Sequence, residues 1–177
     1  MNKTLLCLTA VIGFSLLNVA TADPLTECHK RAIAMQSIEA LPFCQEACDQ
    51  NDGLGCHILG DLYAGGVLVK VVELDYHKAK TYYEKACNLN FGLGCESLGD
   101  LYRYGKGVRQ DYKQAETSYR KACNLHNTGT GCFSLGMLYE YGKGEIQSFQ
   151  KAKKYYGKAC DLGYQEGCDA YRRLNDK

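Results

Sequence analysis

The sequence contains no tryptophan, only two prolines and almost no net charge. Its 21 basic and 20 acidic side chains leave a formal charge of +1 at pH 7, which argues against nucleic acid or an anionic membrane as a partner. It also lacks a C-x2-C pair, a G-x-G-x-x-G or P-loop sequence, and histidines at ligand-like spacing. We therefore expect no metal, no cofactor and no redox centre.

Apolar runs are also scarce, and the one long run, from Leu5 to Val19, lies near the N-terminus behind Lys3. The alanines at the end of Ala20-Thr21-Ala22 then form an A-x-A cleavage site, so we expect 1–22 to be a secretory signal peptide. The alternative is a transmembrane anchor, for which the run is short. Cleavage removes Lys3 and Cys7 and leaves a formally neutral chain with an even number of cysteines. We expect a secreted or periplasmic protein without a membrane anchor.

Tyrosine and cysteine are abundant, with fourteen and eleven residues, and most of them fall in two blocks that recur along the chain. One block reads CHILGDLYAGG from Cys56, CESLGDLYRYGKG from Cys95 and CFSLGMLYEYGKG from Cys132; the other reads DYHKAKTYYEKAC over 75–87, DYKQAETSYRKAC over 111–123 and SFQKAKKYYGKAC over 148–160. Copies recur every 36 to 39 residues, which is the period of two-helix solenoid units.

The block that ends in K-A-C has the pattern of an amphipathic helix. In its first copy, Ala79, Tyr82, Tyr83 and Ala86 fall at i, i+3, i+4 and i+7. The three copies begin with an N-cap residue type, namely Asp75, Asp111 and Ser148.

The block that begins with cysteine predicts the other helix of each hairpin. Leu59, Leu62 and Tyr63 form its apolar stripe in the first copy. A glycine inside a helix costs about 1 kcal/mol relative to alanine. Each copy nevertheless keeps one, at Gly60, Gly99 and Gly136, which predicts close approach of a neighbouring helix.

The two ends of the chain depart from the repeat and are expected to cap the stack. We expect one helix from Leu25 to Ala40 that stops before Pro42, a short second helix over Phe43–Gln50, and a closing helix over Gly167–Leu174. The predicted organisation is a signal peptide over 1–22 and a solenoid over 23–177, with repeats near 25–50, 53–88, 92–124, 129–161 and 165–177.

These blocks resemble Sel1-like repeats over nearly the whole mature chain. With a cysteine at both ends of each junction, the sequence resembles the cysteine-rich secreted branch known from Helicobacter. The resemblance implies an all-α, right-handed α/α solenoid of TPR-like hairpins that acts as a monomer and binds a protein, a peptide or a peptidoglycan fragment. It also implies an alternative function, because the cysteine-rich branch is associated with penicillin binding and weak β-lactamase activity.

The repeated cysteines narrow the possible disulfide pairings. Each pair joins the end of one helix to the start of the next, and antiparallel packed helices bring such ends within disulfide range. The expected pairs are Cys48–Cys56, Cys87–Cys95, Cys123–Cys132 and Cys160–Cys168, which leaves Cys28 and Cys44 to join the first two helices. A structural zinc site is a poorer interpretation of these cysteines than disulfides, because zinc ligands lie closer together in the sequence.

Two S-x-x-K sequences are the candidates for β-lactamase chemistry, since this motif supplies the serine and the amine of serine β-lactamases. They are Ser118 with Lys121 and Ser148 with Lys151. No S-D-N or K-T-G sequence accompanies them, and both serines have structural interpretations. Ser148 occupies an N-cap position and Ser118 replaces a tyrosine of the Y-Y pair. A catalytic site is therefore not visible in the sequence.

The remaining candidate site is the concave face of the predicted solenoid. The resemblance places the first helix of each hairpin on this face, where its residues outside the apolar stripe are exposed. They are His57, Asp61, Ala64, Glu96, Asp100, Arg103, Phe133, Met137 and Glu140, and they change from acidic to apolar along the stack. We expect these side chains to contact an extended ligand; the alternative is a solvated helix surface without a ligand.

Overall fold

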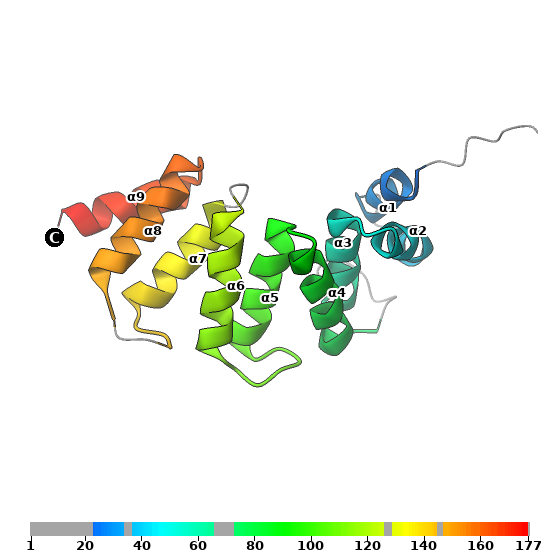
Figure 1. Ribbon diagram of the computed structural model, residues 1–177, viewed down its shortest axis with the longest axis horizontal. Helices are drawn as coiled ribbons and strands as arrows, with labels where there is room; N and C mark the ends of the chain where they lie inside the picture. Colours follow the sequence, from blue (N-terminus) through cyan, green and yellow to red (C-terminus); the bar gives the residue numbers. More distant parts are fainter. Residues whose placement is uncertain (1–22, 34–36, 66–72, 126–128, 145–146, 177) are drawn as a thin grey trace, which may run out of the picture.

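In the computed structural model, the described residues are 23–33, 37–65, 73–125, 129–144 and 147–176, and they form α-helices joined by turns (Figure 1). The helices are α1 (Pro24–Ile33), α2 (Ser37–Asp49), α3 (Gly53–Tyr63), α4 (Tyr76–Asn88), α5 (Gly92–Tyr104), α6 (Tyr112–Asn124), α7 (Gly129–Glu140), α8 (Phe149–Asp161) and α9 (Gln165–Asn175). The predicted all-α class is confirmed. The expected signal peptide lies outside the described residues.

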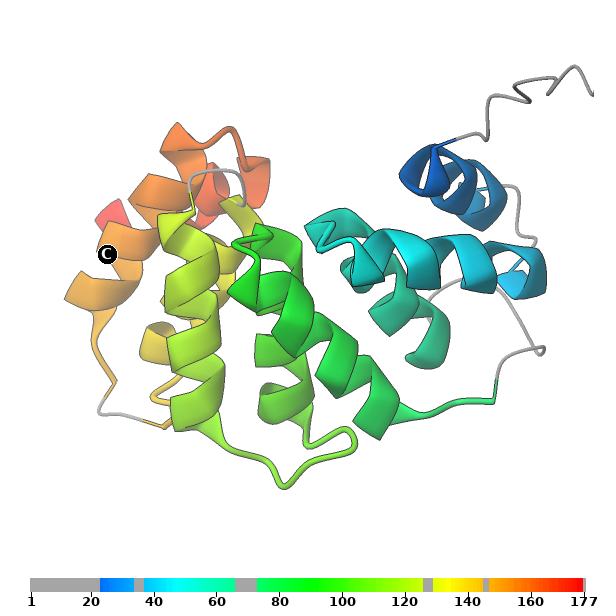
Figure 2. The ribbon, with the colours of Figure 1, turned by 45° about the vertical axis from the view of Figure 1, so that its right-hand side comes forward.

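Consecutive helices pack as hairpins that stand side by side from α1 and α2 at one end to α8 and α9 at the other (Figures 1 and 2). The odd-numbered helices also contact one another, from α1 to α3 and on to α9. A layer whose members touch along the stack lies on the inside of its curve. We call the surface of α3, α5 and α7 on this side the inner face. The fold is the predicted α/α solenoid.

The even-numbered helices start where the sequence predicts. The carboxylate of Asp75 accepts the N–H groups of His77 and Lys78, and Asp111 does the same one repeat later. In α8 the hydroxyl of Ser148 accepts the N–H of Lys151 at 3.3 Å. The three N-caps are therefore confirmed, and each satisfies N–H groups that have no partner inside the helix.

The prediction for the N-terminal hairpin was wrong in its boundary. The first helix ends at Ile33, and α2 begins at Ser37, so that Pro42 lies inside α2. Proline costs a helix one hydrogen bond, but here its ring is exposed while Ala40, Cys44, Ala47 and Cys48 form a continuous buried stripe. Tertiary packing of this stripe therefore outweighs the local preference of proline, and the second helix is longer than predicted.

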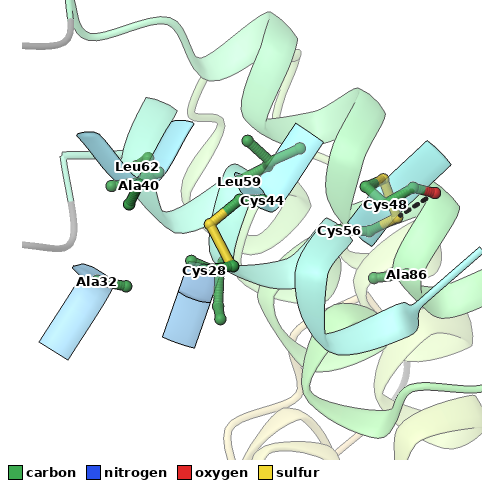
Figure 3. Close-up of a cluster of buried hydrophobic side chains, with 10 residues drawn as sticks. Cys28, Ala32, Ala40, Cys44, Cys48, Cys56, Leu59, Leu62 and Ala86 are labelled. Carbon is green, nitrogen blue, oxygen red and sulfur yellow. Dashed lines mark hydrogen bonds between the residues drawn. A yellow bond between two sulfur atoms is a disulfide. The ribbon is translucent and has the colours of Figure 1, made fainter. Parts of the chain in front are cut away.

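The five disulfides join Cys28 to Cys44, Cys48 to Cys56, Cys87 to Cys95, Cys123 to Cys132, and Cys160 to Cys168. These pairs coincide with those expected from the sequence. Four of them connect the end of an even-numbered helix to the start of the next odd-numbered helix. Figure 3 shows the first two beside Leu59, Leu62 and Ala86 in a cluster of buried side chains. The disulfides thus form part of the core at one edge of the stack.

The glycines inside α3, α5 and α7 make room for tyrosine rings. A Cβ atom on Gly60 would lie 2.3 Å from the ring of Tyr83, and one on Gly99 would lie 2.6 Å from the ring of Tyr119. Gly136 meets Tyr156 in the same way at 2.7 Å. In each repeat, one tyrosine ring of the even-numbered helix therefore packs over the glycine of the preceding helix and extends toward the inner face. This tyrosine is the second of the Y-Y pair, and in the repeat where serine replaces the first tyrosine it is Tyr119.

Gly99→Ala should destabilise the protein by about 1 to 2 kcal/mol. The added methyl group meets Tyr119, which is 0% exposed, and the overpacking cost exceeds the gain of about 1 kcal/mol in helix propensity. Gly157→Ala in α8 is the matched control, because its nearest contact, the partly exposed ring of Tyr171, lies farther away at 3.2 Å. Urea unfolding of both variants tests this; equal midpoints would contradict it.

Candidate functional site

Near the start of each inner helix, a residue that we predicted to lie on the concave face contacts the next repeat. The His57 Nε2 atom lies 3.2 Å from the Ser97 hydroxyl oxygen, which links α3 to α5. Glu96 accepts a hydrogen bond from the Thr130 hydroxyl, and the Phe133 ring centroid lies 5.3 Å from that of Tyr164. These three positions are partly buried and hold neighbouring inner helices together, so only part of each side chain remains available for a ligand.

One turn later, the inner face carries carboxylates that accept hydrogen bonds from tyrosines of the outer helices. The Tyr83 hydroxyl donates to Asp61 Oδ1 at 2.7 Å, and the Tyr119 hydroxyl donates to Asp100. Burial, together with the nearby carboxylates, raises the pKa of Tyr83 and of Tyr119 well above the ordinary range. The two tyrosines therefore stay neutral and act as donors at physiological pH.

The third repeat makes the same bond with a carboxylate one helical turn farther on. Met137 occupies the position of Asp61 and Asp100, and the Tyr156 hydroxyl donates instead to Glu140 Oε2 at 2.6 Å. Arg173 of α9 donates to both oxygens of Glu140, at 2.6 and 2.8 Å. Glu140 is only 5% exposed, so its assignment to the accessible concave face was wrong. Its role is to hold α7, α8 and α9 together.

The inner face therefore divides into two parts along the stack. Within the part of the chain that the structure describes, no lysine or arginine forms an ion pair with Asp61 or Asp100. His57 Nδ1 lies 3.5 Å from Asp61 Oδ2, but burial lowers the pKa of His57 and favours the neutral ring. The α3–α5 part, which we call acidic, carries these two carboxylates, with Arg103 close to the Tyr119 hydroxyl. Phe133 and Met137 make the α7 part apolar.

A hollow of about 170 Å³ opens on the acidic part between α3 and α5. Tyr83, Ser97, Asp100 and Lys106 contribute polar groups to its lining, and Tyr104, which is 57% exposed, forms one wall. Ala64 leaves this space open, whereas the equivalent residue in the next repeat is Arg103, whose guanidinium lies 5.0 Å from the Tyr104 ring centroid. A single side chain of a bound peptide matches a hollow of this size.

Lowering the pH should destabilise the native protein more than the His57→Gln variant. Burial depresses the pKa of His57 below its ordinary value of 6.5, so below pH 6.5 the unfolded chain binds a proton that the folded chain does not. Stability associated with the neutral ring is present above pH 6.5 and is lost as the pH falls through the lower folded pKa. Urea midpoints at about pH 7.5 and about pH 5 test this. Burial also raises the pKa of Glu96, which makes the folded state more stable as the pH falls. This effect is the same in both proteins, so it cancels when their urea midpoints are compared. A variant whose midpoint depends on pH as strongly as that of the native protein would contradict the prediction.

The residues of the two S-x-x-K sequences have roles in helix capping and packing. The Ser148 hydroxyl caps α8, and the Lys151 ammonium lies 4.7 Å from the Tyr139 ring centroid. Ser118 is 7% exposed in α6, and Lys121 lies in the last turn of that helix. Neither serine therefore lies in a recognisable acylation site.

Sequence reasoning missed the tyrosine hydroxyls that reach the inner face. Their signal is present in the repeats, because the glycine, the following acid and the second tyrosine of the Y-Y pair recur together in the first two copies. In the third copy, methionine replaces the acid and Glu140 appears three residues later. Only the structure connects these changes, because the partners belong to different helices.

Helical hairpins stacked through small residues define a solenoid repeat protein, and comparisons with known proteins identify its family. The Sel1 repeat model matches residues 53–91, 93–127 and 130–164. The chain belongs to the Sel1 repeat family, which confirms the resemblance seen in the sequence. A comparison with curated proteins finds no match.

Solved structures agree with this assignment. Cysteine rich protein B of Helicobacter pylori is 36% identical, with a TM-score of 0.59, over 76% of this chain and 93% of that protein. A protective antigen of uropathogenic Escherichia coli is 27% identical, with a TM-score of 0.69, over 79% of this chain. A Sel1 repeat protein of Oxalobacter formigenes is 24% identical, with a TM-score of 0.72, over 82% of this chain. The chain spans 29% of the Escherichia protein and 57% of the Oxalobacter protein.

The disulfides indicate where such a protein works. Stable disulfides form in oxidising compartments and are rare in the cytosol. All ten cysteines of the described residues are paired, which indicates an oxidising, extracytoplasmic compartment. Among the described residues, no helix combines the length and apolar character needed to cross a bilayer.

Proposed function

We propose that this chain is a secreted or periplasmic interaction module that binds a segment of another protein along its inner face. The observation that carries the proposal is the division of that face into an acidic part, with Asp61 and Asp100 outside any lysine or arginine ion pair among the described residues, and an apolar part at Phe133 and Met137. Carboxylates without a cationic partner attract basic side chains, and partly exposed apolar side chains favour an apolar contact.

The occupant proposed from this pattern is an extended peptide with basic residues at the α3–α5 end and an apolar residue at the α7 end. The hollow beside Ala64 accepts one side chain, and the rigid disulfide-linked stack keeps the contacts preorganised. We propose that the protein acts as a monomer. We also propose that residues 1–22 are a signal peptide that directs it out of the cytoplasm.

The test uses peptides selected from a displayed random library against the oxidised protein, followed by titration of the best binders. Asp61→Asn together with Asp100→Asn keeps the acceptors for Tyr83 and Tyr119 but removes two negative charges. Binding should weaken about tenfold, since two charge-assisted contacts are lost.

The matched control removes two negative charges elsewhere, through Glu84→Gln and Asp161→Asn on exposed parts of the stack. It should bind the peptides as the native protein does. Equal weakening in both double variants indicates nonspecific electrostatics, and peptides without basic residues contradict the proposed occupant.

A further inference from the structure

A second hollow lies away from the inner face. Its volume is about 530 Å³, within the range of about 300 to 1,000 Å³ typical of small-molecule sites. Its lining comes from the end of α5, the connection between α5 and α6, the first turn of α6, and Gly144 after α7. Figure 1 shows the connection between α5 and α6 at the bottom of the stack. Its lining includes Tyr102, Val108, Arg109, Tyr112, Lys113 and Gly144.

Packing between the repeats preforms this hollow. Gly144 has a φ of +85°, and a Cβ atom on it would lie 2.6 Å from the Cβ atom of Tyr112. The connection after α7 is therefore held against the first turn of α6. The Lys143 ammonium lies 5.7 Å from the Tyr112 ring centroid, and Gln110 Nε2 donates to the Tyr112 hydroxyl at 3.0 Å.

Positive charge gathers around the hollow. Arg109 and Lys113 line it and are exposed, and Lys143 lies at its edge over Tyr112. Among the described residues, none of these three side chains has an ion-pair partner. Asp111 is the acidic residue in the lining, but its Oδ1 atom accepts the N–H groups of Lys113 and Gln114 at 2.9 and 3.0 Å. Among the described residues, three cations therefore surround the hollow with one acid, and that acid is already hydrogen-bonded.

The rest of the lining is ring and aliphatic carbon. Tyr102 and Tyr112 contribute aromatic surface, and Val108 adds an aliphatic contact. A ligand for this hollow needs negative groups for the cations and a broad face for the rings. Carbohydrate rings carrying carboxylate or sulfate groups have both properties, whereas an acidic peptide side chain offers a charge on a narrow stem.

We propose that this hollow is a second binding site, independent of the inner face, and that its ligand is an acidic glycan. Arg109 and Lys113 bind the carboxylate or sulfate groups, and the sugar ring packs against Tyr112. The net charge of the chain does not indicate this site, because the chain is nearly neutral as a whole and the cations gather at one edge.

Titration of the full-length oxidised protein with a heparin-derived tetrasaccharide tests the proposal. Arg109→Ala together with Lys113→Ala should weaken binding about tenfold or more, because two charged hydrogen-bond donors are lost. The control, Lys30→Ala together with Arg172→Ala, removes the same charge from exposed positions in α1 and α9 and should bind normally.

Three comparison ligands distinguish an acidic-glycan site from a general polyanion site and from a lipid-binding surface. Neutral chitotetraose should bind much more weakly than the tetrasaccharide, and hexaglutamate should also bind more weakly. Equal affinity for hexaglutamate, or equal weakening in the control variant, overturns the proposal in favour of nonspecific polyanion binding. Binding to phosphatidylglycerol vesicles without binding to the tetrasaccharide overturns it in favour of a lipid surface.

Discussion

Reduction of the five disulfides is expected to shift the urea midpoint of unfolding to a much lower concentration, or to leave the protein unfolded without denaturant. Four disulfides close loops with sequence separations of 8 or 9, and Cys28–Cys44 has a separation of 16. The chain-entropy model assigns each small loop about 2.5 kcal/mol and the longer one about 3 kcal/mol. Their combined effect is comparable with the total stability of about 5 to 15 kcal/mol typical of a domain.

The core offers little to replace this contribution. The buried hydrophobic residues are mostly alanine and cysteine, with fewer leucines and tyrosines, and glycine lies at the closest crossings. Small side chains bury little apolar area, so thin interfaces supply less hydrophobic stabilisation than leucine-rich ones. Unfolding followed by circular dichroism, with and without a phosphine reductant, measures the difference. Coincident midpoints would show that the interfaces alone stabilise the stack.

Replacing single pairs by alanine refines this prediction. A solenoid is stabilised by contacts between neighbouring repeats. Loss of Cys87–Cys95 in the middle should therefore uncouple the two halves and broaden the transition, whereas loss of Cys28–Cys44 should affect mainly the terminal hairpin. Each substitution should cost about 2 to 3 kcal/mol. Identical sharp transitions for both variants would contradict this division.

The sequence was sufficient to predict the repeating part of the fold because each repeat carries its own signals. An N-cap acid or serine, a helical stripe and a glycine for close approach recur at fixed spacing, so the starts of α4, α6 and α8 are specified locally. The N-terminal hairpin lacks this repetition. There the position of Pro42 suggested a boundary, whereas the buried stripe from Ala40 to Cys48 determines the helix.

The inner face was harder to predict because exposure depends on residues that are distant in sequence. Asp61 in α3 and Glu140 in α7 both lie on helices that form the inner face. The side chain of Asp61 is nevertheless 33% exposed and that of Glu140 only 6% exposed. The difference comes from Arg173, which lies 33 residues away and covers Glu140. Periodicity identifies the side of a helix, but it does not identify which partner covers it.

Glu140→Ala should destabilise the protein by about 2 to 4 kcal/mol, although alanine is the natural residue at the equivalent Ala64. The substitution leaves the Tyr156 hydroxyl, on a side chain only 1% exposed, without its acceptor and removes the partner of Arg173. The loss comes mainly from the tyrosine, because the Arg173 side chain is 47% exposed and water can replace its ion pair. Urea unfolding of the oxidised variant measures the cost.

Adding Met137→Asp to this variant should recover about 1 kcal/mol or more, because it returns the carboxylate to the position held by Asp61 and Asp100 in the earlier repeats. Those two acids accept the hydroxyls of Tyr83 and Tyr119, and the same geometry predicts that an acid at 137 accepts the hydroxyl of Tyr156. Met137→Asp alone is the control and should not stabilise, since Glu140 already serves the tyrosine. If the double variant is no more stable than Glu140→Ala, the tyrosine–carboxylate bond is not interchangeable between the two positions, and the ion pair with Arg173 is the main contribution of Glu140.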